Sequence, residues 1–272
     1  MQSAFVNFNS SRIHYSYAGK GSRMLLCFHG YGETEESFHF LQPYLEHDYQ
    51  IIAIDLPYHG KTKWKEGLKC SVTDLTAIIN TIRIERSITS SSFTVMGFSL
   101  GGRLALSLLQ ETPDSIEKAV LLAPDGFTVN FWYWLATQTR VGNRLFKFTM
   151  RHVSWFKLLL KTGNTLKMVN PSVYKFTKHF IDDKQVRNDL YVRWTCMRKF
   201  RPELRIVKTM IVRYHMPVTL VYGEYDKIIR YEHGERFRSG IEPFCTVQVI
   251  ASGHQVLHQK NAEVIVNALA IH

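Results

Sequence analysis

Blocks of apolar and polar residues alternate along the first 125 residues in a way that predicts strands separated by helices. Short runs rich in β-branched and aromatic residues predict strands at 5–8, 13–17, 24–28, 50–54, 92–96 and 118–122. The first two lie close together in the sequence and predict an opening hairpin. The later runs are continuously apolar, which is typical of strands covered on both faces.

Helical periodicity fills the gaps between these strands, at 35–45, 72–84 and 100–110. Ser71 is a suitable N-cap for the second helix, and Pro113 closes the third. Strands that alternate with helices in this way indicate β-α-β units. We therefore expect an α/β fold with a mostly parallel sheet.

The pattern changes at Phe127. Segments such as 131–135 and 153–160 are aromatic and basic and have helical spacing, and no further strand is predicted before 217–222. The alternation is then completed by a helix at 233–237, a strand at 246–250 and a closing helix at 262–270. A sheet of about eight strands with helices on both faces is expected, interrupted by a helical insertion.

The charge distribution supports the same division of the chain. The protein has 272 residues and a formal net charge of +11. Residues 126–216 contain 9 Lys and 9 Arg against 3 Asp and 1 Glu, whereas the remainder has a small acidic excess. We therefore expect a core domain formed by residues 1–125 and 217–272, and a basic helical lid subdomain at 126–216.

The composition disfavours several classes of protein. Residues 1–17 lack the pattern of a signal peptide, and no stretch reaches the ~18 apolar residues of a membrane span, so a cytoplasmic protein is expected. The four cysteines form no C-x-x-C pair and are expected to be reduced and structural. The 12 histidines show no metal-binding spacing. No recognition motif accompanies the positive charge, so a nucleic acid partner is not expected. No cofactor is expected either.

The sequence G-F-S-L-G-G at 97–102 carries the clearest chemical signal. It follows a predicted strand directly and opens a predicted helix, which is the context of a nucleophile elbow. Glycine at positions 97 and 101 leaves room for a tight turn that exposes the Ser99 hydroxyl. The N-terminus of the following helix directs N–H groups toward any oxyanion that forms there.

A serine hydroxyl needs a base, and the base needs a group that orients it. Asp226 and His254 each lie just beyond a predicted strand, in the order serine, aspartate, histidine. Asp125, which follows the strand at 118–122, is an alternative acid, although an aspartate before a glycine is more often a turn residue.

These motifs together resemble the α/β-hydrolase superfamily along nearly the whole chain. The matching segments are H-G-Y-G at 29–32, D-L-P-Y-H-G at 55–60, G-F-S-L-G-G at 97–102, G-E-Y-D at 223–226 and G-H at 253–254. Their order is that of the superfamily. One departure is Tyr58, where many members have glycine, and little consequence is expected from it.

The resemblance implies a role for each residue of the site. Ser99 would be the nucleophile, His254 the general base and then acid, and Asp226 the carboxylate that orients it. The backbone amides of Leu100 and Tyr31 would form the oxyanion hole.

The elbow also resembles that of the menaquinone-pathway lyase that makes a succinyl-cyclohexadiene carboxylate. In that sub-pattern the arginine four residues after the serine, here Arg103, helps to hold an anionic substrate. Arg103 could equally point to solvent. Phe98, Trp132 and Trp155 are further candidates for substrate contact, although the aromatic residues of the insertion are more often core.

Three functions remain open from the sequence. The first is a serine hydrolase that cleaves a carboxylic ester or thioester of a small-molecule acyl substrate, either anionic or carrier-bound. The second is a lyase that uses the same three residues, and the third is a non-catalytic binding protein. The basic residues of 126–216 would face solvent, an anionic substrate, a carrier protein or a membrane surface.

Overall fold

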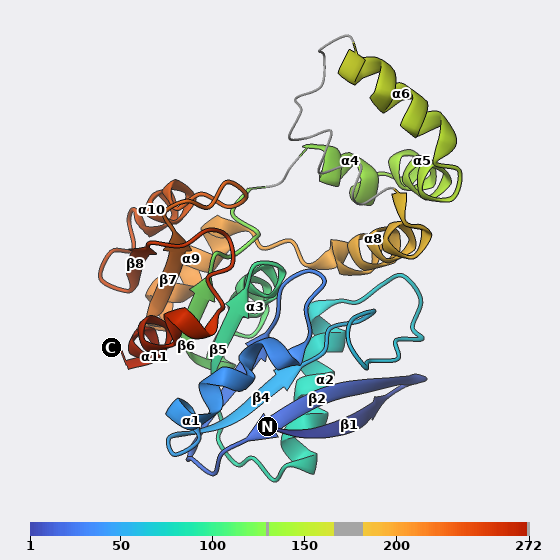
Figure 1. Cartoon of the computed structure of the whole chain (residues 1–272). Helices are drawn as coiled ribbons and strands as arrows, with labels where there is room; N and C mark the ends of the chain where they lie inside the picture. Colours follow the sequence, from blue (N-terminus) through green and yellow to red (C-terminus); the bar gives the residue numbers. More distant parts are fainter. Residues whose placement is uncertain (129–130, 166–181, 271–272) are drawn as a thin grey trace. The chain divides into compact units, whose positions relative to one another are not determined.

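The computed structural model of the protein describes residues 1–128, 131–165 and 182–270 (Figure 1). All eight predicted strands are present. They are β1 (Gln2–Phe8), β2 (Ser11–Ala18), β3 (Arg23–Phe28), β4 (Tyr49–Ile54), β5 (Phe93–Phe98), β6 (Ile116–Leu122), β7 (Val218–Gly223) and β8 (Cys245–Ile250).

The eight strands form one sheet in the order β1-β2-β4-β3-β5-β6-β7-β8. β1 and β2 form the expected antiparallel hairpin, and β2 also pairs with β4 in antiparallel fashion. All other pairs are parallel. The chain passes from β3 to β4 on one side and later adds β5 on the other side of β3. The carboxyl ends of β3 and β5 therefore lie where the winding direction reverses, which is the usual place for a site in such a sheet.

Helices cover both faces of this sheet. Those that belong to it are α1 (Gln42–Leu45), α2 (Val72–Glu85), α3 (Leu100–Glu111), α9 (Leu204–Arg213), α10 (Glu232–Arg238) and α11 (Ala262–Ala270). α2, α3 and α9 pack in a row, with α3 resting on β3, β5 and β6, while α11 packs on β7. Strands covered in this way are fully buried, and every residue of β5 and β7 is buried. Burial on both faces is the physical cause of the continuous apolar runs in the sequence.

Local sequence signals explain where α2 begins and why the helix predicted at 35–45 is interrupted. Ser71 caps α2 through its hydroxyl, which accepts a hydrogen bond from the Asp74 amide, and the Asp74 carboxylate accepts one from the Ser71 amide. The predicted helix at 35–45 is instead a 3-10 helix, Glu35–Leu41, followed by the single turn of α1. Pro43 lacks the N–H that a continuous α-helix would need at that point.

The chain divides into two compact units. One consists of residues Met1–Glu66, Ser71–Thr128 and Lys199–His272, and the other of Gly67–Cys70 and Val129–Arg198. Residues 199–216 were assigned to the insertion from the sequence, but here they lie in the sheet unit, because α9 packs against α3. Residues 129–130 and 166–181 of the expected insertion lie outside the described residues. That the second unit acts as a lid stays a prediction.

The second unit is helical in its described part. Its helices are α4 (Phe131–Gln138), α5 (Arg140–Arg151), α6 (Ser154–Thr165) and α8 (Lys184–Cys196). α5 packs between α4 and α8, and the ring of Trp194 on α8 lies 5.1 Å from Tyr133 and 5.8 Å from Phe146. No helix among the described residues combines the length and the apolar character needed to cross a membrane.

Candidate active site

Ser99 lies at a sharp turn between β5 and α3, as the sequence predicts. Its φ is +49° and its ψ is −112°, a backbone conformation that L-residues rarely adopt. The turn is held on both sides, because the Ser99 amide donates to the Leu122 carbonyl and the Ser99 carbonyl accepts from the amides of Gly102 and Asp125. Such a strained serine, fixed by its neighbours, is typical of a functional position.

The glycines around Ser99 make this turn sterically feasible. A Cβ on Gly101 would lie 1.9 Å from the Phe28 carbonyl oxygen, and one on Gly97 would lie 2.4 Å from the Gly101 carbonyl oxygen. Both contacts are with backbone, which cannot move aside. The first turn of α3 therefore approaches the end of β3 so closely that no side chain fits between the two backbone segments.

The loops after β7 and β8 bring two titratable side chains to Ser99. The Nε2 atom of His254 lies 3.0 Å from the Ser99 hydroxyl oxygen, and the His254 Nδ1 atom lies 2.7 Å from Oδ2 of Asp226. The three residues are separated by up to 155 positions in the sequence. They form a continuous hydrogen-bonded chain.

Backbone amides hold the Asp226 carboxylate in place, in addition to its bond to His254. Its carboxylate is buried, and its Oδ1 atom accepts hydrogen bonds from the amides of Ile228 and Ile229, at 2.7 and 2.9 Å. An ionised carboxylate offers only acceptor atoms. It therefore accepts a hydrogen bond from Nδ1–H of His254, which leaves Nε2 as the acceptor for the Ser99 hydroxyl.

Of the two predicted oxyanion donors, Tyr31 lies in the loop after β3 and Leu100 is the first residue of α3. His29 holds this loop: its Nε2 atom accepts from the Leu56 amide at 3.1 Å, so its Nδ1 atom is the donor to the Gly30 carbonyl, at 2.8 Å. His29 therefore braces the loop after β3 from the loop after β4.

A side-chain bridge that the sequence did not indicate links this loop to the loop of His254. Glu33 accepts a hydrogen bond from the Gly30 amide at 3.3 Å and another from Nε2 of Gln255 at 2.7 Å. Phe98, a predicted substrate contact, places its ring 5.4 Å from that of His254.

The model of the alpha/beta hydrolase fold matches this chain over residues 23–260. The chain belongs to the α/β hydrolase fold family. The family assignment and the fold predicted from the sequence are both confirmed.

Named relatives of this α/β hydrolase include an uncharacterized hydrolase, YugF, of Bacillus subtilis. It is 24% identical over 260 residues, which cover 91% of this chain and 89% of the relative. A putative 2-succinyl-6-hydroxy-2,4-cyclohexadiene-1-carboxylate synthase of the same organism is 30% identical over 120 residues, 41% of each chain. Among solved structures, a thermophilic esterase from Thermogutta terrifontis with malate bound has a TM-score of 0.69 at 15% identity, covering 99% of this chain and 97% of its own. That likeness is one of fold.

Two of the candidate residues of this hydrolase bind each other. The Arg103 guanidinium on α3 forms an ion pair with the Asp125 carboxylate, which follows β6. Asp125 also accepts a hydrogen bond from the Gly126 amide at 2.6 Å. The alternative acid and the predicted anion-binding residue thus form a pair of their own, separate from the chain of Ser99, His254 and Asp226.

Trp132 and Trp155, the other candidates for substrate contact, belong to the second unit. Both side chains are exposed, and each contacts its phenylalanine neighbour, Phe131 at 5.3 Å and Phe156 at 5.7 Å between ring centroids. Substrate contact by either tryptophan stays a prediction.

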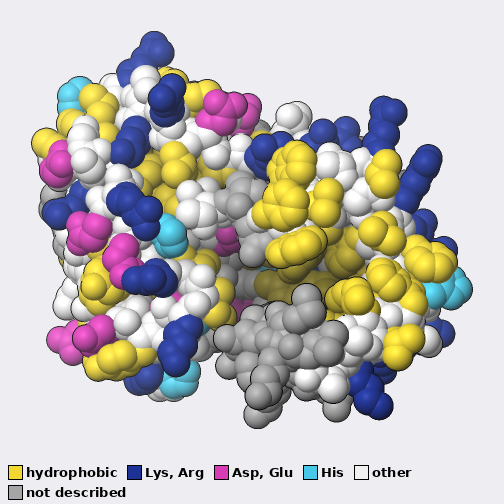
Figure 2. Space-filling model, turned by 90° about the horizontal axis from the view of Figure 1, so that it is seen from above, with side chains coloured by type: hydrophobic (Ala, Val, Ile, Leu, Met, Phe, Trp, Pro, Cys, Tyr) yellow, Lys and Arg dark blue, Asp and Glu magenta, His cyan; other side chains and the backbone are white. Residues whose placement is uncertain are grey.

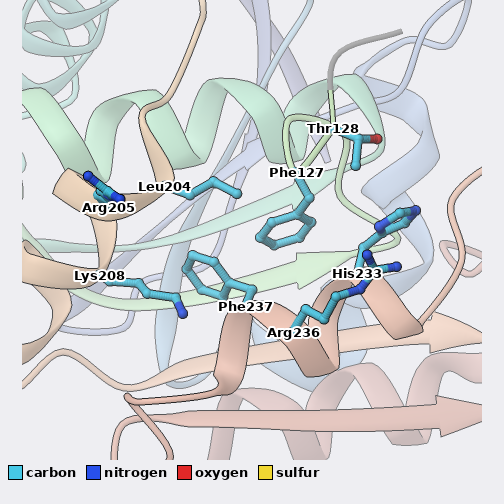
Figure 3. A pocket seen from close by; sticks show the side chains of 8 residues that line it. All are labelled: Phe127, Thr128, Leu204, Arg205, Lys208, His233, Arg236 and Phe237. Carbon is cyan, nitrogen blue, oxygen red and sulfur yellow. The ribbon is translucent and has the colours of Figure 1, made fainter.

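A hollow of about 250 Å³ opens in the sheet unit between the loop after β6, α9 and α10 (Figure 3). Phe127 and Phe237 form its apolar floor, with their ring centroids 4.8 Å apart. The basic side chains that line it are Arg205, Lys208, His233 and Arg236. A smaller hollow shares Phe127 and His233 with it and reaches Ile228 and Ile229, whose amides hold Asp226. Neither hollow could be expected from the sequence, because their walls come from segments that lie far apart along the chain.

A buried polar cluster lies on β2 and the loop after β4. Nδ1 of His14 is 2.7 Å from Oδ2 of Asp55 and 3.7 Å from Oε1 of Glu35, so the three could hold a metal by residue type. Hydrogen bonds already use the Asp55 carboxylate, however, which accepts from the amides of Glu35 and Lys61. The cluster therefore holds the loop after β4.

Proposed function

We propose that the protein is a serine hydrolase that cleaves a carboxylic ester or thioester through an acyl-enzyme. The observation that carries the proposal is the hydrogen-bonded chain from Ser99 through His254 to Asp226, with distances of 3.0 and 2.7 Å. A serine placed at a strained turn and bound to a histidine with an oriented tautomer is the arrangement that activates a hydroxyl.

In the first half of the reaction the Ser99 oxygen attacks the acyl carbon, and its proton passes to Nε2 of His254. The Asp226 carboxylate stabilises the imidazolium through Nδ1–H. The negative charge that forms on the acyl oxygen is stabilised by the amides of Leu100 and Tyr31. The C–O or C–S bond then breaks, and His254 returns the proton to the leaving alcohol or thiol.

In the second half, water attacks the acyl-Ser99 ester while His254 removes its proton. The second tetrahedral intermediate uses the same amides. Its collapse releases the carboxylic acid, and the proton on His254 returns to the Ser99 oxygen. No redox step or external co-reactant other than water is required.

A fluorophosphonate probe tests the nucleophile directly. We expect covalent labelling at Ser99, identified by peptide mass spectrometry, and no labelling of Ser99→Ala. Labelling at another residue, or none in a folded protein, would contradict the proposal. Turnover of p-nitrophenyl esters of graded chain length, compared with acyl-carrier-protein thioesters, would then define the acyl group.

The two other functions have less support. A lyase of the menaquinone-pathway type would use Arg103 for an anionic substrate, but here Asp125 binds that guanidinium. The partial likeness to the Bacillus subtilis synthase covers 41% of the chain. A purely binding function would leave the strained turn at Ser99 and its two hydrogen-bonded partners without a use.

A further inference from the structure

The second unit exposes an unusual number of large apolar side chains. Nine of the sixteen exposed large hydrophobic residues among those described lie on α4, α5 and α6, which contribute only 32 residues. They are Phe131, Trp132, Trp134, Val141, Leu145, Phe148, Trp155, Leu158 and Leu159. Gathered exposure of this kind marks an interaction surface more often than single exposed residues do.

Helix α5 shows how this surface is organised. Its buried side, which includes Gly142 and Thr149, carries Phe146 against Tyr191 and Trp194 of α8. Val141, Leu145 and Phe148 follow an i, i+4, i+7 spacing and therefore share a second face, where they are 77%, 52% and 52% exposed. Among the residues that the structure describes, none buries this apolar face of α5.

A third face of α5 is basic and borders the apolar one. Arg140, Arg144, Lys147 and Arg151 have i, i+4, i+7 and i+11 spacing, which places them about 100° around the helix from Val141, Leu145 and Phe148. Figure 2 shows hydrophobic side chains gathered on the surface of this unit, with Lys and Arg side chains around them.

The formal charges on α4, α5 and α6 are all positive. Residues 131–165 contain six Lys and Arg residues and no Asp or Glu. One of the six, Lys157, forms an ion pair with Asp182 of the same unit, at 2.8 Å. None of the other five has an ion pair with any residue that the structure describes.

We propose that α5, together with the exposed aromatic residues of α4 and α6, docks on the surface of an anionic lipid bilayer. Val141, Leu145 and Phe148 would enter the boundary between headgroups and acyl chains, while Arg144 and Lys147 contact lipid phosphates. Adjacent apolar and basic faces on one helix are the pattern of an interfacial helix. Exposed tryptophans are favoured at the same depth, because the ring is apolar and its N–H is polar.

An acidic protein partner is the less favoured occupant. Protein interfaces concentrate their affinity in a few central pockets. Here the apolar residues are spread over three helices, and the basic residues form a continuous row beside them, which suits a laterally uniform surface. The docking is independent of the proposed hydrolysis, and its test requires no turnover.

The experiment is co-sedimentation of the full chain with vesicles of phosphatidylcholine alone and with one third phosphatidylglycerol. We expect binding to the anionic vesicles that weakens as salt is raised and is at least tenfold weaker to the neutral ones. The Val141→Ser, Leu145→Ser, Phe148→Ser triple variant should lose most of this binding. The Arg144→Glu, Lys147→Glu pair should weaken it more than tenfold.

Matched controls keep the result interpretable. Ile84→Ser removes a side chain that is 79% exposed on the sheet unit, and Lys61→Glu with Lys65→Glu reverses two exposed charges there. Both should bind as the unaltered chain does, and circular dichroism should show equal helix content in all variants. Absence of vesicle binding would overturn the proposal. So would equal loss in the controls, or a change only in self-association measured by sedimentation velocity.

Discussion

The guanidinium of Arg103 and the carboxylate of Asp125 bind each other beside the Ser99 turn. The Arg103 side chain is 12% exposed and that of Asp125 is 29% exposed, so the pair is partly shielded from water. Its position one helical turn after Ser99 gives it a clear structural use, because it ties α3 to the end of β6.

We therefore expect Arg103→Ala to affect stability more than ester turnover. Loss of the pair should cost about 1 kcal/mol and lower the melting temperature by a few degrees. The kcat for p-nitrophenyl esters should change less than about threefold. A fall of more than a hundredfold in a folded protein would instead place the guanidinium on the substrate and favour the lyase.

The two candidate acids can be separated by a matched pair of substitutions. Asp226→Asn should reduce kcat by about 10⁴-fold, because the amide cannot hold His254 in the tautomer that accepts from Ser99. Asp125→Asn, which leaves the bonds of His254 untouched, should retain most activity. Thermal unfolding of both variants checks that they are folded. The reverse order of effects would assign the orienting role to Asp125.

Gly101 sets the geometry of the proposed nucleophile. Gly101→Ala would place a Cβ 1.9 Å from the Phe28 carbonyl oxygen, and relief requires α3 and β3 to separate. We expect a loss of several kcal/mol in the free energy of unfolding together with loss of probe labelling at Ser99. Gly253→Ala is a control for stability, since a Cβ there meets nothing within 4 Å. Equal unfolding midpoints for the two variants in urea would contradict the steric argument.

The four cysteines are free and buried, which agrees with the expectation of structural thiols. Burial raises the pKa of the Cys245 thiol to about 12, and it raises the pKa of the Cys27 thiol further. A thiol with a raised pKa binds its proton more tightly in the folded state than in the unfolded state. The folded protein should therefore lose stability as the pH rises above about 8.5, the ordinary thiol pKa.

Thiol reactivity tests whether Cys27 and Cys245 are buried in the native protein. We expect these two cysteines to resist a thiol-reactive disulfide reagent at pH 8 in the native protein, and all four to react after addition of denaturant. Rapid labelling of Cys27 or Cys245 in the native state would show that the sheet opens locally.

The positions of the strands could be predicted because burial on both faces leaves a direct trace in the sequence. β5 and β7 are mostly apolar runs in which every residue is buried. Ser99, Asp226 and His254 could be named as candidates because each lies within four residues of the end of a strand. The order of the strands along the chain restricts which other residues can lie at the carboxyl-end edge of the sheet.

Other features depend on tertiary contacts that no local pattern records. The partner of Arg103 could not be predicted from the sequence. The orientation of a side chain on a helix surface depends on the residues that pack against that helix in the folded protein. Tyr58 has φ +63°, where glycine would be unstrained, so its departure from the family pattern costs more backbone strain than expected. The position of α9 was missed because a basic amphipathic helix is equally suited to an insertion or to a sheet.

The bridge from Glu33 to Gln255 spans 222 positions and joins the first third of the chain to its last strand loop. Ser99 can occupy its turn once β3, β5 and β6 have associated, but the imidazole arrives only with the segment after β8. Competence for hydrolysis would then mark the completion of folding: a nascent or C-terminally truncated chain would possess the reactive alcohol yet remain chemically inert.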